Sequence, residues 1–335
     1  MQVRAPYRGI DKLPAEPVVM IGEHQMKSIR IKSYAKINLA IDVKGLLENG
    51  YHEVEMIMQQ VELHDEVLVR WFERKGGGTD ILLNTNRAYL PKDERNLAYR
   101  AAALMAQKYG QEKNGTIRID IRKNIPVAAG LAGGSGNAGA VIHALNKLWN
   151  LGLSLEQLME DGKALGADVP FTIMGQARCN SVLDKAVRKD PMAASCAYAY
   201  YDGTKLRPLP ALHSNIVLSK PPVGVSTKEV YQGIDEVEIS ERPDIAELIR
   251  GLEQENSHFI KKNMINVLEF YTLKKYNCIM NTKDMAIQCD GVDTVLMSGS
   301  GPTVICIAES EACAQAAASR MKQVNRETFL TRTTL

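Results

Sequence analysis

Apolar and polar positions alternate along residues 29–43, and this pattern predicts a strand with one buried face. Every second position in this stretch is apolar or small, with charged or polar side chains between. A period of two residues is typical of a strand, because successive side chains point to opposite faces of a sheet. Lys36 and Asn38 therefore lie on the same face of the predicted strand.

The same reasoning along the rest of the chain predicts a mixture of strands and helices. Further strands are expected at residues 56–60, 61–71, 116–122, 215–219, 294–297 and 303–308, with an interruption near His64 and Asp65. Helices are expected at residues 95–109, 137–149, 155–165, 226–232, 259–276 and 309–324. Ser154 followed by Gln157 is a capping-box pattern, and Asp202–Gly203 predicts a hairpin turn. The mixture indicates an α+β or α/β protein.

Composition and charge exclude several classes of protein. The 335 residues favour two domains, and 45% hydrophobic with 24% charged residues is ordinary for a globular protein. A net charge of +2 without a basic tract argues against a nucleic-acid partner. No apolar stretch near the N-terminus is long enough for a signal sequence or membrane span. Six irregularly spaced cysteines predict reduced thiols in a cytoplasmic protein.

The most informative segment is A-G-L-A-G-G-S-G-N-A-G at residues 129–139, which has five glycines in front of a predicted helix. Glycines let backbone N–H groups approach an anion, and a helix N-terminus adds unpaired N–H groups and a positive dipole end. Ser135 adds a hydroxyl that can bind a phosphate oxygen or Mg²⁺. A tight loop without a ligand is the alternative, and we favour a phosphate site.

Two common phosphate-binding motifs fit this segment poorly. It lacks the G-K-[ST] of a Walker loop. Gly134, Gly136 and Gly139 match G-x-G-x-x-G by count, but in a dinucleotide fold these glycines directly follow the first strand. A nicotinamide-dependent enzyme therefore stays as an alternative that predicts NAD binding, which we expect to be absent.

Several motifs together resemble the GHMP kinases. They are S-Y-A-K-I-N-L at 33–39, G-Y-H-E-V at 50–54, D-E-R-N-L-A at 93–98, I-P-V-A-A-G-L-A-G-G-S at 125–135, L-G-A-D-V-P-F at 165–171, K-P-P-V-G-V-S-T-K-E-V-Y at 220–231 and S-G-S-G-P-T at 298–303. The resemblance covers about residues 28–319. It is greatest to the members of the family that phosphorylate the 2-hydroxyl of 4-diphosphocytidyl-2-C-methyl-D-erythritol in the non-mevalonate route to isoprenoids.

The resemblance implies an α+β fold of two domains, the first like domain 2 of ribosomal protein S5 and the second ferredoxin-like. It divides the chain into an N-terminal extension (1–27), an ATP-binding domain (28–175), an insert (176–196) and a C-terminal domain (197–335).

The resemblance also implies catalytic roles. Asp168 would be the base that takes the proton of the substrate hydroxyl. Lys36 would orient Asp168 and offset developing charge, and Asn38 would contact the same hydroxyl. Without the resemblance, Asp168 reads as a helix-terminus or turn residue before Pro170.

The same resemblance assigns the binding residues. Tyr51 and His52 would hold the cytosine base, and Tyr231 would close its other face. The ATP site would comprise Asn96, Lys123, Pro126, Ala129, Gly130, Leu131, Ala132, Gly133, Gly134, Ser135 and Gly136. ATP would be the co-substrate, with Mg²⁺ at Ser135. Core packing is the alternative for both tyrosines, a satisfied turn histidine for His52 and a solvated strand end for Lys123.

The chain departs from the family pattern in three places. Ala132 and Gly136 replace a glycine and a serine of the usual loop, which keeps it small. About twenty residues follow Gly175 where the family continues directly into a hairpin. In that hairpin Tyr201 and Thr204 replace a glycine and a glutamate. A non-catalytic ligand-binding regulator and a GHMP kinase for another alcohol therefore stay open, as does the choice between monomer and homodimer.

Overall fold

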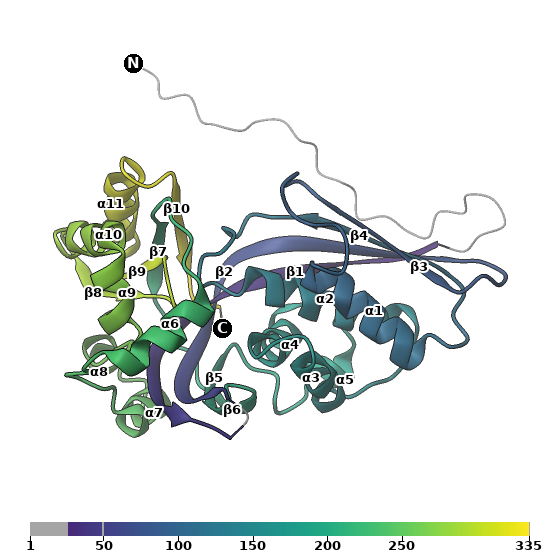
Figure 1. Ribbon diagram of the computed structural model, residues 1–335, viewed down its shortest axis with the longest axis horizontal. Coiled ribbons are helices and arrows are strands. Elements are labelled where there is room, and N and C mark those ends of the chain that lie inside the picture. Colours follow the sequence, from purple (N-terminus) through teal and green to yellow (C-terminus); the bar gives the residue numbers. More distant parts are fainter. Residues whose placement is uncertain (1–25, 49, 335) are drawn as a thin grey trace, which may run out of the picture.

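The computed structural model describes residues 26–48 and 50–334 and contains two β-sheets side by side (Figure 1). Most of the predicted N-terminal extension, at residues 1–25, lies outside the described residues, and so does Asn49 of the predicted turn. The described helices include none that is long and apolar enough to cross a membrane.

The first sheet has six strands and is built on a long antiparallel pair, β1 (Met26–Leu46) and β2 (His52–Glu73). The pattern-based prediction of the first strand is confirmed. The predicted interruption near His64 is a register shift, in which β2 stays continuous while two of its residues have no partner between Tyr34 and Ala35. Such a bulge bends the strand without ending it.

Four shorter strands complete this sheet in the order β3-β4-β2-β5-β6. They are β3 (Thr79–Thr85), β4 (Gly115–Arg122), β5 (Cys196–Tyr201) and β6 (Lys205–Leu209). The hairpin predicted around Asp202–Gly203 is therefore β5–β6, and it pairs with β2. Sequence reasoning began the C-terminal domain at residue 197, whereas the change of sheet lies between Leu209 and Asn215. The domain boundaries themselves stay a proposal.

Helices cover one side of the first sheet (Figure 1). They are α1 (Leu97–Tyr109), α2 (Gly133–Leu148), α3 (Leu155–Lys163), α4 (Asp168–Cys179) and α5 (Lys185–Arg188). The capping box of α3 is present, with the Ser154 hydroxyl accepting from the Gln157 backbone. Helix α2 packs against β1, α1 and α4 and is buried almost all round. This burial holds its glycine-rich first turn in place.

The second sheet is antiparallel, in the order β10-β7-β9-β8. Its strands are β7 (Asn215–Lys220), β8 (Val292–Met297), β9 (Val304–Ala308) and β10 (Glu327–Arg332). Counted within this sheet the order is 4-1-3-2, with helices between the first two and last two strands. This is the expected ferredoxin-like arrangement.

The helices of the second half are α6 (Thr227–Gly233), the 3₁₀ helix η1 (Ile234–Glu236), α7 (Ile245–Glu253), α8 (Ser257–Lys262), α9 (Glu269–Lys275), α10 (Asn277–Ile287) and α11 (Glu311–Lys322). The single helix predicted at residues 259–276 is two helices, α8 and α9. Asn266 lies between them, and its amide donates to the carbonyls of Met297 and Gly299.

Candidate active site

A cleft of about 980 Å³ lies between the two halves of the molecule. Its walls come from β1, the start of β2, the first turns of α1, α2 and α4, the β5–β6 turn and α6. The polar and aromatic residues of these walls include Lys36, Tyr51, His52, Asn96, Lys123, Ser135, Asn137, Asp168, Asp202, Thr227, Tyr231 and Ser300.

Lys36 and Asp168 form an ion pair at the centre of the cleft. The Lys36 Nζ lies 3.7 Å from the Asp168 Oδ1 and donates to the Asn38 Oδ1 at 2.7 Å. The Lys36 side chain is 6% exposed, whereas that of Asp168 is 36% exposed. Asp168 is the first residue of α4, where the helix dipole favours a negative charge. The buried lysine is therefore fixed, and the carboxylate beside it can be reached by a ligand.

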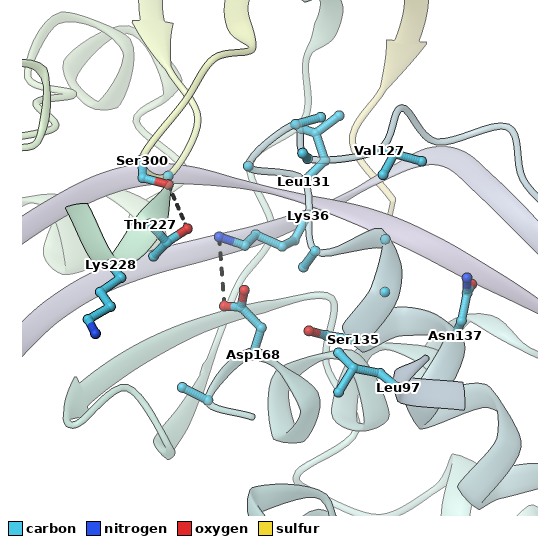
Figure 2. A pocket seen from close by; sticks show the side chains of 18 of the residues that line it. Lys36, Leu97, Val127, Leu131, Ser135, Asn137, Asp168, Thr227, Lys228 and Ser300 are labelled. Atoms are coloured by element: carbon cyan, nitrogen blue, oxygen red, sulfur yellow. Dashed lines mark hydrogen bonds and ion pairs between the residues drawn. The ribbon is translucent and has the colours of Figure 1, made fainter. Parts of the chain in front are cut away.

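The glycine-rich segment ends in the uncapped N-terminus of a helix. Ala132 has a left-handed backbone, with φ of 53°, and α2 begins at Gly133 without a side-chain cap. The helix starts four residues earlier than the predicted residue 137, so Gly133, Gly134 and Ser135 are its first turn. Their N–H groups and the positive end of the dipole are suited to binding an anion. Figure 2 shows the Ser135 hydroxyl facing the same space as the Asp168 carboxylate.

A second loop, residues 298–302, packs against this segment. The Ser298 hydroxyl donates to the Gly130 carbonyl at 3.0 Å. Gly130 has φ of 71°, and a Cβ there would lie 2.3 Å from the Ser298 carbonyl oxygen. Only glycine combines this backbone with such close approach. The Ser300 hydroxyl lies 2.9 Å from that of Thr227 on α6, as Figure 2 shows. The loop at residues 298–302, from the second half of the chain, thus packs against the glycine-rich segment and holds it in place.

Two of the later glycines serve packing. A Cβ at Gly136 would lie 2.5 Å from the Ser33 hydroxyl, and one at Gly139 would lie 2.9 Å from the Thr172 hydroxyl. Gly134 is exposed and has room for a side chain, with its nearest neighbour at 3.6 Å. The match to G-x-G-x-x-G therefore reflects helix packing at two of its three positions. It gives no support to a dinucleotide site.

Lys123 is held by a buried carboxylate. Its ammonium pairs with Asp65, and both side chains are 5% exposed or less. Asp65 also accepts from the backbone N–H groups of Asn124 and Ile125, at 2.7 and 2.8 Å. Asp65 thus positions both Lys123 and the start of the loop that leads to the glycines.

Two asparagines line the cleft near this loop. Asn96 caps α1 through its Oδ1, which accepts from Ala98, and its amide donates to the Pro91 carbonyl. Asn137 is 4% exposed, and its Oδ1 has no partner among the described residues. A buried carbonyl without a donor is costly. Asn137 also lines the cleft, and its side chain is for that reason a candidate contact for a bound nucleotide, one that no motif indicated.

Tyr51, His52 and Tyr231 form the far end of the cleft. The rings of His52 and Tyr231 lie 5.4 Å apart. Burial, and then the nearby charge of Asp168, raise the pKa of Tyr231 above its ordinary value. Tyr51 is exposed at the rim, where its ring can be covered by a ligand. The His52 Nε2 lies 3.0 Å from the Asp235 carboxylate, a partner that no motif indicated.

The structure brings the expected site residues together with two exceptions. Asn38 is fully buried behind Lys36 and contacts that lysine and Met56, so it does not line the cleft. Gly136 is also absent from the cleft wall, because it faces Ser33. All the other residues assigned to catalysis, substrate and ATP line one continuous cleft.

The altered hairpin borders the site, because Asp202 at its turn lines the cleft. Tyr201 has φ of 65°, a backbone region that favours the glycine of the family pattern. The Thr204 hydroxyl donates to the Asp202 Oδ1 at 2.6 Å. Among the described residues, no cluster of three or more His, Cys, Asp or Glu side chains could hold a metal ion.

Family models match both halves of the chain. The model for the GHMP kinases N terminal domain matches residues 96–176, and that for the GHMP kinases C terminal matches residues 237–327. This chain belongs to the GHMP kinases. The N-terminal match of this GHMP kinase contains the first turn of α2 and Asp168, which are the uncapped helix N-terminus and the partly exposed carboxylate of the cleft.

Individual proteins with known names are similar to this GHMP kinase over most of its length. A protein of Acetivibrio thermocellus named 4-diphosphocytidyl-2-C-methyl-D-erythritol kinase is 42% identical over 92% of this chain and 100% of its own length. One of Clostridium botulinum (strain Eklund 17B / Type B) with the same name is 42% identical over 91% of this chain and 100% of its own length. A crystal structure titled 4-(cytidine 5'-diphospho)-2C-methyl-D-erythritol kinase matches with a TM-score of 0.71 and 26% identity, covering 91% of this chain and 99% of that one.

Proposed function

We propose that this GHMP kinase transfers the γ-phosphoryl group of ATP to the 2-hydroxyl of 4-diphosphocytidyl-2-C-methyl-D-erythritol, a step of isoprenoid precursor biosynthesis. Relatives about 40% identical over nine tenths of the chain carry that name. The observation that carries the proposal is the arrangement of groups in one cleft. The Lys36 backbone N–H donates to the Leu131 carbonyl just before α2, and the charge of Asp168 acts on Tyr231, so the pair adjoins both the helix N-terminus and the aromatic end.

This arrangement fits phosphoryl transfer between two bound nucleotides. The N–H groups at the start of α2 bind the phosphates of ATP. Asp168 accepts the proton of the substrate hydroxyl as that oxygen attacks the γ-phosphorus, and ADP leaves with the electron pair of the broken bond. Lys36 holds the carboxylate in place and offsets the negative charge that develops on the transferred group. Asn38 does not contact the substrate but fixes the Lys36 ammonium by accepting a hydrogen bond from it.

Mg²⁺ belongs to the proposal as the usual counter-ion of ATP. The cleft offers the Ser135 hydroxyl, an oxygen donor of the kind that Mg²⁺ prefers. Few protein oxygens are present, which fits an ion held mainly by phosphates and water. Mg²⁺ would neutralise part of the phosphate charge, and Ser135 would be its protein ligand.

The other end of the cleft fits a cytidine nucleotide. Tyr51 and Tyr231 offer aromatic faces for stacking, and His52 adds a hydrogen-bonding ring beside that of Tyr231. The Lys36–Asp168 pair would then lie near both the bound cytidine nucleotide and the phosphate donor. A substrate with a reacting hydroxyl on a chain beyond its diphosphate suits this arrangement.

The proposal is tested by coupling ADP release to NADH oxidation with 4-diphosphocytidyl-2-C-methyl-D-erythritol as acceptor. We expect turnover that requires both this substrate and ATP. Turnover with mevalonate or homoserine in its place would contradict the substrate and leave the kinase class intact. No ADP release with any alcohol, while ATP binds, would favour a non-catalytic regulator.

The regulator alternative has little support from the insert that suggested it. Residues 176–196 complete α4 and form α5, and Leu183 and Val187 are buried in the first core. The segment is therefore part of the first half's packing. A cytoplasmic location, a monomer or homodimer and the absence of a nucleic-acid partner remain further proposals. The six free thiols suit a reducing compartment.

A further inference from the structure

Asp235 lies beside the proposed base-binding end of the cleft and has no role in the family pattern described above. It belongs to η1, in the second half of the chain, whereas its partner His52 begins β2 in the first half. We propose that Asp235 is a positioning residue that makes the cleft select cytosine over uracil, by holding His52 in one tautomer. This inference rests on the proposed function, because it assigns the base specificity of the same site.

The chemistry of the contact assigns the proton on the imidazole. The His52 Nε2 lies 3.0 and 3.1 Å from the two oxygens of the Asp235 carboxylate. An ionised carboxylate can only accept, so Nε2 carries the hydrogen. In the neutral ring, Nδ1 is then left with a lone pair and accepts hydrogen bonds. Among the described residues, Nδ1 has no hydrogen-bond partner.

His52 and the backbone that carries Asp235 are held in place by their surroundings, whereas the Asp235 side chain is 46% exposed. The His52 side chain is only 9% exposed and packs against the Tyr231 ring. On the other side, Ile234 is buried, and Gly233 lies so close to the Tyr271 ring that a Cβ would meet it at 2.1 Å. The helix turn that carries Asp235 is therefore fixed on α9.

A second contact holds the segment after η1 against β1, near the start of β2. The Arg242 guanidinium lies 2.5 Å from the buried Asp42 carboxylate and donates to the Val43 carbonyl at 2.8 Å. Asp42 and Val43 belong to β1, close to where it pairs with the start of β2. The Asp235–His52 contact and the Arg242 contacts thus both link this segment to the first sheet. The Asp235–His52 contact is formed by the folded chain itself, without a bound ligand.

An acceptor at Nδ1 distinguishes the two pyrimidines. Cytosine carries an amino group at C4, which donates, whereas uracil carries a carbonyl there, which accepts. An imidazole that can only accept at this position binds the amino group and leaves the uracil carbonyl facing a lone pair. Sites that hydrogen-bond a substrate N–H reject analogues that lack it far more strongly than apolar sites do. Asp235 thereby controls specificity without touching the base.

The experiment measures the dissociation constants of CDP and UDP by calorimetry, with ADP saturating so that the ATP site is filled. We expect the wild-type protein to prefer CDP by about 100-fold, as a lost hydrogen bond with an unpaired buried acceptor implies. Asp235→Asn keeps the shape of the side chain but offers an amide that can also donate to Nε2. The His52 ring is then no longer restricted to the tautomer with hydrogen on Nε2. The preference should fall below about 10-fold, mainly through weaker CDP binding.

Glu236→Gln is the matched control, since it removes the same charge one residue away on the exposed face of η1. It should leave the CDP preference within about twofold of wild type. In steady-state assays, Asp235→Asn should raise the KM for the cytidine substrate about tenfold and leave the KM for ATP unchanged. A variant that merely lost stability would change both constants.

The nitrogen-15 NMR spectrum of histidine-labelled protein provides a direct second readout. We expect the His52 signals of a neutral ring with hydrogen on Nε2, and loss of this state in Asp235→Asn. A wild-type ring with hydrogen on Nδ1, or on both nitrogens, would overturn the inference, as would an unchanged CDP preference in Asp235→Asn. A wild-type protein that binds ADP but neither CDP nor UDP would overturn the proposed function, and the inference with it.

Discussion

Replacing Asp65 by asparagine is expected to be the most destabilising single change near the cleft. Asp65 is completely buried and accepts from the Lys123 ammonium and from the backbone N–H groups of Asn124 and Ile125. Asparagine removes the charge and leaves Lys123 buried without a counter-ion. Breaking a buried pair in this way costs about 3–5 kcal/mol.

For a domain of this size, that loss corresponds to a fall of about 10 °C in melting temperature. The measurement is thermal unfolding followed by circular dichroism. Glu66→Gln on the same strand is the control, because its pair with Arg30 is about one third exposed at both ends. Such an exposed pair contributes less than about 1 kcal/mol.

A double variant separates the charge from the loss of hydrogen bonds. Asp65→Asn combined with Lys123→Met removes the uncompensated ammonium, and we expect it to recover at least about half of the lost stability. An Asp65→Asn protein as stable as Glu66→Gln would refute the reasoning. So would a double variant less stable than Asp65→Asn alone.

Two further predictions concern stability at low pH and the binding of ATP. Burial lowers the pKa of His143 from 6.5 to about 4, so the stability it contributes is complete above pH 6.5 and is lost as the pH falls towards 4. Between pH 7 and pH 5 this loss is about 2 kcal/mol. Measured by urea denaturation, the free energy of unfolding of His143→Gln should therefore fall by about that much less than that of the wild type over this range. An equal fall in the two proteins would contradict the assignment. Asn137→Ala should raise the KM for ATP about tenfold with little change in kcat, and an unchanged KM would show that the buried Oδ1 does not contact the nucleotide.

Sequence patterns predicted the local structure well where that structure depends only on residues near one another along the chain. The alternation at residues 29–43 and the capping box at Ser154 depend only on neighbours along the chain, and both are confirmed. The start of α2 was predicted four residues late. Gly133, Gly134 and Gly136 have low helix propensity, and here packing against β1, α1 and α4 outweighs it.

The site residues divide in the same way. Motifs identified Lys36 and Asp168 because the resemblance includes them. Asp65, Asn137 and Asp235 carried no motif, since each matters through a contact with a residue far along the chain or with a ligand. Asp65 had no distinguishing signal, because the neighbouring residues Glu62, His64 and Glu66 of β2 are polar as well. The placement of Asn38 behind Lys36 could not be predicted either, because strand alternation gives the face but not the depth of burial.

The central claim is that Asp168 is the base of a phosphoryl transfer and takes no part in holding ATP. Asp168→Asn keeps the size of the side chain and removes its basicity. We expect kcat to fall about 10³-fold, within the range for a lost general base, while the dissociation constant of ATP changes less than about twofold. Rapid-quench measurement of a single turnover, combined with calorimetric titration of ATP, gives both values. Loss of ATP binding, or a transfer rate equal to that of the wild type, would contradict the claim.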